Sequence, residues 1–161
     1  SRWRTSAARM PAVFTLRDFV RESNRIEGIG RVRPVEIQAH ELFLERPPTV
    51  AAIEALVDSI AGAALRDRYG MNCRIGAHLP RLGGPHIRVE LEALVHEILA
   101  GRLTPCEAHC TYKTLHPFMD GNGRSGRALW IREMGGIARV PLGFLHTFYY
   151  QSLQAVRGPR R

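Results

Sequence analysis

Apolar side chains recur along most of this chain every three or four residues, the spacing of helices that bury one face. Threonines stand where helix N-caps are needed, at Thr15, Thr49 and Thr104. Pro34 and Pro105 suit a first helical position, where no intrahelical N–H bond is lost. Glycines and further prolines mark the expected ends. The predicted helices cover residues 16–28, 34–45, 50–65, 88–99, 105–115, 124–135 and 142–156.

Residues 70–85 break the helical pattern. They are rich in glycine and proline and contain a short strand-like piece at residues 72–75, which predicts a β-hairpin or an extended loop. No repeat or linker divides the chain, and 161 residues suffice for one domain with a buried core. The sequence therefore predicts a single all-α domain over residues 1–161, with one short β-hairpin.

The formal net charge of +8 raises the question of nucleic-acid binding. Lys113 is the only lysine, however, and a bias toward arginine also follows from genome base composition. Arginines near both chain ends add charge without building a site, and no recognition-helix pattern accompanies them. A non-catalytic, basic helical domain that binds nucleic acid stays open as an alternative function.

The cysteines and the hydropathy of the chain bear on its compartment. Cys73, Cys106 and Cys110 make an odd count, and the chain shows no secretion signal, which together predict a reducing, cytoplasmic setting. No run of eighteen apolar residues occurs, so no membrane span is expected.

Two short patterns resemble metal sites. Cys106, His109 and Cys110 fall on one helix face, but no fourth ligand is evident and buried helix cysteines are common. His96 begins a metalloprotease-like pattern, yet Ala100 stands where the second histidine is required. Neither pattern predicts a bound metal.

The segment HPFMDGNGRSGR, residues 116–127, carries the densest chemistry of the chain. Its glycines allow backbone amides to form an anion-binding nest, and a following helix adds partial positive charge. Its arginines suit phosphate oxygens, its aspartate suits Mg²⁺ on a nucleotide, and its histidine can accept a proton. The segment therefore predicts a site for a Mg²⁺-bound polyphosphate with a base beside it.

These residues match the Fic-domain signature HxFx(D/E)GNGRxxR at every specified position, and the chain resembles proteins of that family. The resemblance implies a Fic-type helical bundle with a short hairpin, the flap. It also implies transfer of AMP from ATP to a hydroxyl side chain of a protein substrate. His116 is then the general base, Asp120 holds Mg²⁺, and Phe118 anchors the loop.

The resemblance also assigns the nucleotide contacts. The backbone amides of residues 121–123 line the anion nest, with the Asn122 side chain near the α-phosphate. Arg124 holds the β-phosphate and Arg127 holds the γ-phosphate. The implied nucleotide-binding residues are Gly121, Asn122, Gly123, Arg124 and Arg127.

A second segment, Ser23 to Gly28, matches the family's inhibitory pattern [S/T]xxxE[G/N]. Ser23 and Glu27 are four residues apart and share one helix face, and Gly28 allows the helix to end just beyond them. The resemblance implies an inhibitory helix over about residues 15–28, in which Glu27 pairs with Arg127 and takes the place of the γ-phosphate. Whether the same chain also removes AMP stays open.

The hairpin region resembles the family's flap, which holds a target segment as an added strand. The implied target-binding residues are Asn72, Cys73, Arg74, Ile75 and Gly76, with His78 as a further contact. Phosphorylating relatives carry lysine where this chain has Gly123, so the glycine favours AMP transfer. Transfer of another nucleotide or of a phosphate group is the alternative within this fold. The target protein, the base selectivity and the oligomeric state are left open.

Overall fold

The computed structural model describes residues 14–140. This part of the chain is mostly helical and contains no β-strand. The elements are α1 (Leu16–Ile26), α2 (Pro34–Glu45), α3 (Val50–Ala61), α4 (Pro85–Leu99), α5 (Pro105–Leu115), α6 (Asn122–Glu133) and the 3₁₀ helix η1 (Ile137–Arg139). The all-α prediction is confirmed for these residues. The helix predicted at 142–156 and the arginine-rich ends lie outside the described residues.

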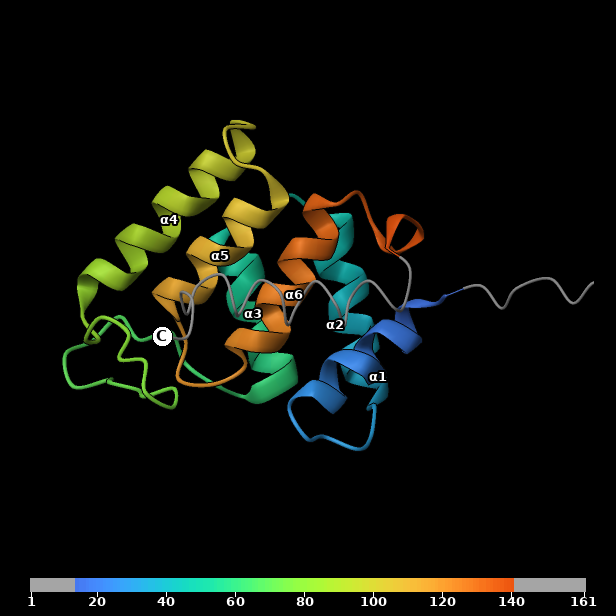
Figure 1. The fold of residues 1–161 in the computed structure, drawn as a ribbon, viewed down its shortest axis with the longest axis horizontal. Coiled ribbons are helices and arrows are strands. Elements are labelled where there is room, and N and C mark those ends of the chain that lie inside the picture. Colours follow the sequence, from blue (N-terminus) through green and yellow to red (C-terminus); the bar gives the residue numbers. More distant parts are fainter. Residues whose placement is uncertain (1–13, 141–161) are drawn as a thin grey trace, which may run out of the picture.

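Helices α5 and α6 lie side by side in the middle of the bundle (Figure 1). Helix α4 flanks α5, helices α2 and α3 pack behind, and α1 lies at the opposite edge against α2 and α6. The segment that joins α5 to α6 is the motif loop, residues 116–121. Its position between two central helices fixes both of its ends.

Local capping explains most helix boundaries. Thr15 and Thr104 each form a capping box, with Asp18 and Glu107 respectively, and Thr49 caps α3 by accepting a bond from the Ala52 amide. All three threonines were expected at these places. Each box satisfies amides that have no intrahelical acceptor.

The prediction was wrong by two residues at the end of α1 and at both ends of α6, and by more at two other helix ends. Helix α3 ends at Ala61 rather than residue 65, because Gly62 takes the left-handed conformation (φ 60°) that closes a helix. Leu65 forms an isolated antiparallel bridge with Phe118 of the motif loop instead. Helix α4 begins at Pro85, three residues before the expected start, since proline again suits the first position.

Two apolar clusters hold the bundle together. The larger one is formed by residues of α2 to α6, and Phe118 of the motif loop is completely buried in it. The smaller one joins Phe19 and Val20 of α1 to Trp130 and Ile131 of α6. Helix α1 is therefore part of the folded core and not a loosely attached segment.

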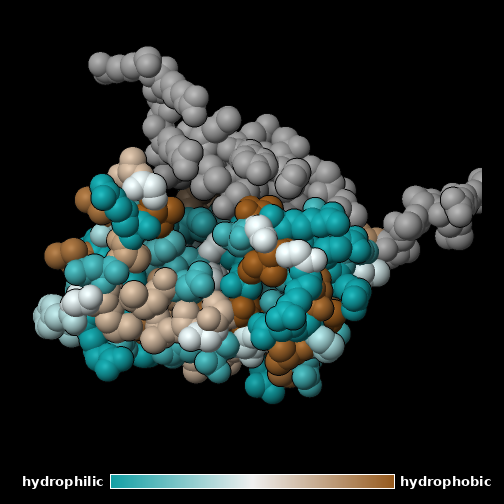
Figure 2. All heavy atoms as spheres, turned by 90° about the horizontal axis from the view of Figure 1, so that it is seen from below, coloured by the Kyte–Doolittle hydropathy of each residue, from teal (hydrophilic) through white to brown (hydrophobic). Residues whose placement is uncertain are grey.

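The expected hairpin is reduced to one bridge. Ile75 and His78 exchange two backbone hydrogen bonds, of 3.0 and 2.8 Å, and no longer ladder follows. On the face shown in Figure 2, hydrophilic residues surround separate hydrophobic spots. Tyr69, Leu79 and Leu82 of the segment between α3 and α4 are largely exposed, so little apolar burial is left to stabilise paired strands. We keep the name flap for residues 72–80.

No helix within residues 14–140 has the length and apolar character needed to cross a membrane.

Candidate active site

The motif loop begins with a left-handed residue. His116 has φ 50° and ψ 62°, and it is the one non-glycine residue between 14 and 140 with positive φ. Gly121, at the other end of the loop, has φ 80°. A Cβ atom at Gly121 would also lie only 2.9 Å from Cβ of Ala61, so both the conformation and the space require glycine there.

Asn122 holds the loop closed. Its side-chain oxygen accepts a bond from the Phe118 amide at 2.9 Å, and its side-chain nitrogen donates to the Phe118 carbonyl at 2.8 Å. Both polar groups of the side chain are therefore engaged within the loop, and its place beside an α-phosphate stays a prediction. Phe118 is buried as predicted.

The N-terminus of α6 points its first amides out of the helix. The Ser125 amide bonds to the carbonyl of Gly121, so the amides of residues 122–124 precede the first complete turn. Such an end attracts anions. The Gly121 amide, predicted to line the nest, donates instead to Oδ1 of Asp120 at 2.7 Å.

Arg127 is buried and bound by α1. Its Nε donates to Oγ of Ser23 and its Nη2 to the Ser23 carbonyl, both at 2.8 Å. Nη2 also lies 2.7 Å from Oε1 of Glu27. The pair that the sequence predicted between Glu27 and Arg127 is thus present, and the predicted inhibitory residue Ser23 contributes two further contacts.

Glu27 also covers the N-terminus of α6. A Cβ atom placed on Gly123 would overlap Oε1 of Glu27, which puts the carboxylate directly over the first turn. Glu27 is the C-cap of α1, and Gly28 beyond it has φ 76°, as expected of a helix end. A carboxylate therefore occupies the position where a helix end and a buried arginine favour an anion.

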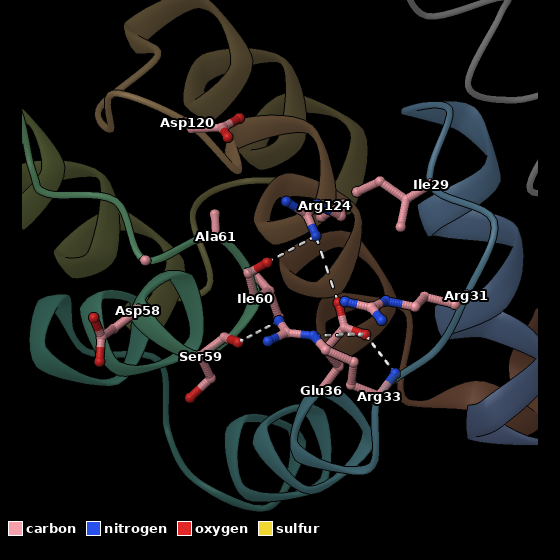
Figure 3. Close-up of a pocket in the computed structure, with 11 residues that line it drawn as sticks. Ile29, Arg31, Arg33, Glu36, Asp58, Ser59, Ile60, Ala61, Asp120 and Arg124 are labelled. Atoms are coloured by element: carbon pink, nitrogen blue, oxygen red, sulfur yellow. Dashed lines mark hydrogen bonds and ion pairs between the residues drawn. The ribbon is translucent and has the colours of Figure 1, made fainter.

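Arg124 lines a pocket of about 440 Å³ that neither Glu27 nor Arg127 borders (Figure 3). Its Nη1 donates to the carbonyl of Ile60 at 2.9 Å and lies 3.5 Å from Oε1 of Glu36. Within residues 14–140 its other nitrogens have no hydrogen-bond partner, and Arg31 and Arg33 border the same pocket. Nη1 of the Arg124 guanidinium is thus held in place, while its Nε and Nη2 can still bind a ligand.

Glu36 is a site residue that the sequence analysis did not identify. It is 2% exposed, accepts a 2.7 Å bond from the Arg33 amide, and lies 3.4 Å from the side-chain nitrogen of Asn24. Its position two residues after Pro34 gave a signal for helix capping, but nothing local indicated contact with Arg124.

Asp120 lies on the exposed side of the loop and borders the same pocket as Arg124. No cluster of three or more metal-ligating side chains occurs within residues 14–140. A single carboxylate is nevertheless a common protein contribution to Mg²⁺, which keeps water ligands and takes the rest from phosphates. The residues present therefore fit a nucleotide-bound Mg²⁺ and not a closed structural metal site.

His116 is set up as a neutral imidazole. Burial and the nearby positive charges of Lys113 and Arg66 lower the pKa of His116 to about 4, against a smaller opposing effect of Asp120. Its Nδ1 is buried without a hydrogen-bond partner among the described residues. At neutral pH the ring is uncharged and able to accept a proton.

Two hydrogen bonds lock α5 to α6 next to the loop. The Tyr112 hydroxyl and the Ser125 hydroxyl are 2.7 Å apart, and Nδ1 of His109 lies 2.9 Å from the Gly126 carbonyl. His109 is therefore a packing residue, as its burial suggests, while Cys106 is exposed on the surface. These bonds fix the His116 end and the α6 end of the loop relative to each other.

The flap residues lie on the chain between α3 and α4. The side-chain oxygen of Asn72 accepts a bond from the Gly83 amide at 3.0 Å and closes the base of the flap. Cys73 is partly buried, Arg74 and Gly76 are exposed, and Ile75 pairs with His78. The structure thus shows a closed loop with an exposed tip.

No family model and no curated protein matches this chain. The likeness to Fic domains consequently rests on the motif residues, on the Ser23–Gly28 pattern, and on the geometry that joins them.

Proposed function

We propose that this chain is a protein adenylyltransferase held inactive by its own first helix. The observation that carries the proposal is the Glu27 carboxylate, bound by Arg127 at 2.7 Å over the N-terminus of α6. A site that holds a carboxylate in this way favours a phosphate once the carboxylate moves. A neutral histidine starts the same loop, as general-base chemistry requires.

The proposed reaction is a single in-line displacement. The hydroxyl oxygen of a target side chain attacks the α-phosphorus of ATP and forms a new P–O bond, while the bond from that phosphorus to the β-phosphate oxygen breaks. Pyrophosphate leaves, and the hydroxyl proton passes to the imidazole of His116. The first amides of α6 stabilise the charge that develops on the α-phosphate.

The remaining site residues hold the phosphate tail. Arg124 faces its pocket with the free part of its fork, and Arg127 is the buried cation that Glu27 now occupies. Asp120 would hold Mg²⁺, which would neutralise part of the negative charge of the phosphates. We call the proposed inhibition by α1 the brake. We propose that it acts because Glu27 occupies Arg127, so that the γ-phosphate cannot bind there and the α-phosphate is turned away from attack.

Intact-mass measurement tests the function. The Glu27→Gly variant, incubated with ATP, Mg²⁺ and a cell extract, is expected to add one AMP group to itself or to a target. Glu45→Gly is the matched control, since Glu45 is an exposed acid at the end of α2. Glu27→Gly combined with His116→Ala should lose the transfer.

The outcomes separate the alternatives. An added phosphate or another nucleotide would replace AMP transfer by the related reaction of the same fold. Salt-dependent DNA binding that ignores Mg²⁺-ATP and survives His116→Ala would instead support the nucleic-acid alternative. Activity that is equal in the parent chain and in Glu27→Gly would remove the brake from the proposal.

A further inference from the structure

Arg66 is the largest buried polar feature that the proposed chemistry does not use. It lies in the segment between α3 and the flap and is 0% exposed. Its guanidinium donates to carbonyls on two sides. Nε and Nη2 bond to His116 and Leu115 at 2.7 and 3.0 Å, and Nη1 bonds to Arg81 and Met71 at 2.8 and 3.3 Å.

The backbone of Arg66 repeats this connection. Its amide donates to the Pro117 carbonyl at 2.8 Å, and its carbonyl accepts a bond from the Gly84 amide at 2.9 Å. Side chain and backbone therefore join the same two regions, the junction of α5 with the motif loop and the base of the flap. None of these bonds involves the residues that face the phosphates.

At the junction, Arg66 stabilises a strained geometry. The carbonyls of Leu115 and His116 are among those left without partners at a helix C-terminus, where a positive charge is favoured. His116 itself is in the left-handed region, which a side chain with Cβ disfavours. The charge of Arg66 also contributes to the lowered pKa of His116.

At the flap, Arg66 holds the two chain segments through which the backbone enters and leaves the flap. Met71 and Arg81 stand on either side of the flap, and one nitrogen of Arg66 holds both carbonyls. Gly83 packs so closely against Met71 that an added Cβ would overlap the Met71 carbonyl. The base of the flap is therefore rigid even though its tip is exposed.

We propose that Arg66 is a positioning residue for the transfer reaction. It holds the flap and the backbone of His116 at a fixed relative position. The inference rests on the proposed function, since it concerns where a hydroxyl held on the flap meets the imidazole. It predicts that a change at Arg66 affects the rate of transfer and not the binding of nucleotide, because the phosphate-binding residues lie elsewhere.

Arg66→Lys in the Glu27→Gly background tests this inference. Lysine keeps the charge, but its single ammonium cannot reproduce the planar fork that reaches four carbonyls. We expect kcat to fall at least tenfold while the Kd for Mg²⁺-ATP stays within about twofold. The matched control is Arg68→Lys, an exposed arginine of the same segment, which should change neither quantity. Equal kcat in Arg66→Lys and its parent overturns the inference.

Two ligand-free readouts separate positioning from simple loss of stability. Amide hydrogen exchange at Ile75 and His78 should speed up in Arg66→Lys by more than it does in helix α4. Titration of His116 by NMR should show a higher pKa in Arg66→Met, in which the positive charge is lost. Unchanged exchange in the flap and an unchanged titration overturn the inference.

A second variant covers the case in which Arg66→Lys does not fold. Asn72→Ala leaves Arg66 in place and removes only the bond that closes the flap at Gly83. It should lower kcat for a protein target several-fold without changing nucleotide affinity, and an unchanged kcat overturns the inference. If the Glu27→Gly parent itself transfers no AMP, the proposed function fails first, and this inference fails with it.

Discussion

Oε1 of Glu27 lies 2.7 Å from Nη2 of Arg127, although 100 residues separate them in the chain. The Arg127 side chain is 1% exposed, whereas the Glu27 side chain is 37% exposed. The arginine is therefore fixed by its burial, and Glu27 is the partner with room to leave.

The contact between Glu27 and Gly123 gives a double-mutant prediction. Gly123→Ala places a Cβ atom where Oε1 of Glu27 now lies, so the carboxylate must move away from Arg127, and we expect a loss of stability of about 1–3 kcal/mol from the broken charged hydrogen bond. In the Glu27→Gly background the obstacle is absent, and alanine is the better helix former by up to about 1 kcal/mol. Urea unfolding of the four proteins measures both effects. Equal losses in the two backgrounds would show that the overlap is not with Glu27.

The buried acid Glu36 leads to a prediction about nucleotide affinity. Glu36→Gln keeps the shape of the side chain but removes the charge that holds Nη1 of Arg124. We expect Mg²⁺-ATP to bind about fivefold more weakly in the Glu27→Gly background, which corresponds to a loss of about 1 kcal/mol. Isothermal titration calorimetry measures this difference. The exposed Glu41 on the same helix is the control, since Glu41→Gln should leave the affinity unchanged, and stronger binding by Glu36→Gln would contradict the prediction.

His109 makes stability depend on pH. Burial lowers the pKa of His109 to about 4 in the folded protein, from about 6.5 in an unfolded chain. Above pH 6.5 both states are neutral. As the pH falls from 6.5 to 4 the unfolded state binds a proton that the folded state does not, so the free energy of unfolding falls by about 3 kcal/mol from this residue.

Chemical unfolding at several pH values between 4 and 7.5 measures this dependence. His109→Gln should flatten the acid side of the curve, while His96→Gln, at an exposed position of α4, should leave its slope as it was. The same slope in His109→Gln and in the parent would assign the acid sensitivity to other groups.

Local interactions were predictable from the sequence, and so was the pair between Glu27 and Arg127. Thr15, Thr49 and Thr104 cap helices with residues three positions away, so a short window contains the whole interaction. Glu27 and Arg127 are distant in sequence, and the prediction succeeded because each lies in a pattern of its own. The motif loop was identified for the same reason.

The residues that support the site were not predictable in this way. Arg66 bonds to the carbonyl of a residue 50 positions away, and Arg124 to one 64 positions away. Every residue has a backbone carbonyl whatever its side chain, so no sequence pattern indicates such contacts. Strand propensity likewise overstated the flap, because its apolar residues found no surface to pack against.

The burial of α1 determines how the proposed inhibition could be released. Phe19 and Val20 are 0% exposed, and returning each to water costs roughly 1.5–3 kcal/mol. An activator that lifts the whole helix must therefore offer an apolar surface of its own in exchange. A signal that only turns the Glu27 side chain outward meets no such barrier, so a reversible chemical change at this one carboxylate can act on a domain that stays fully folded.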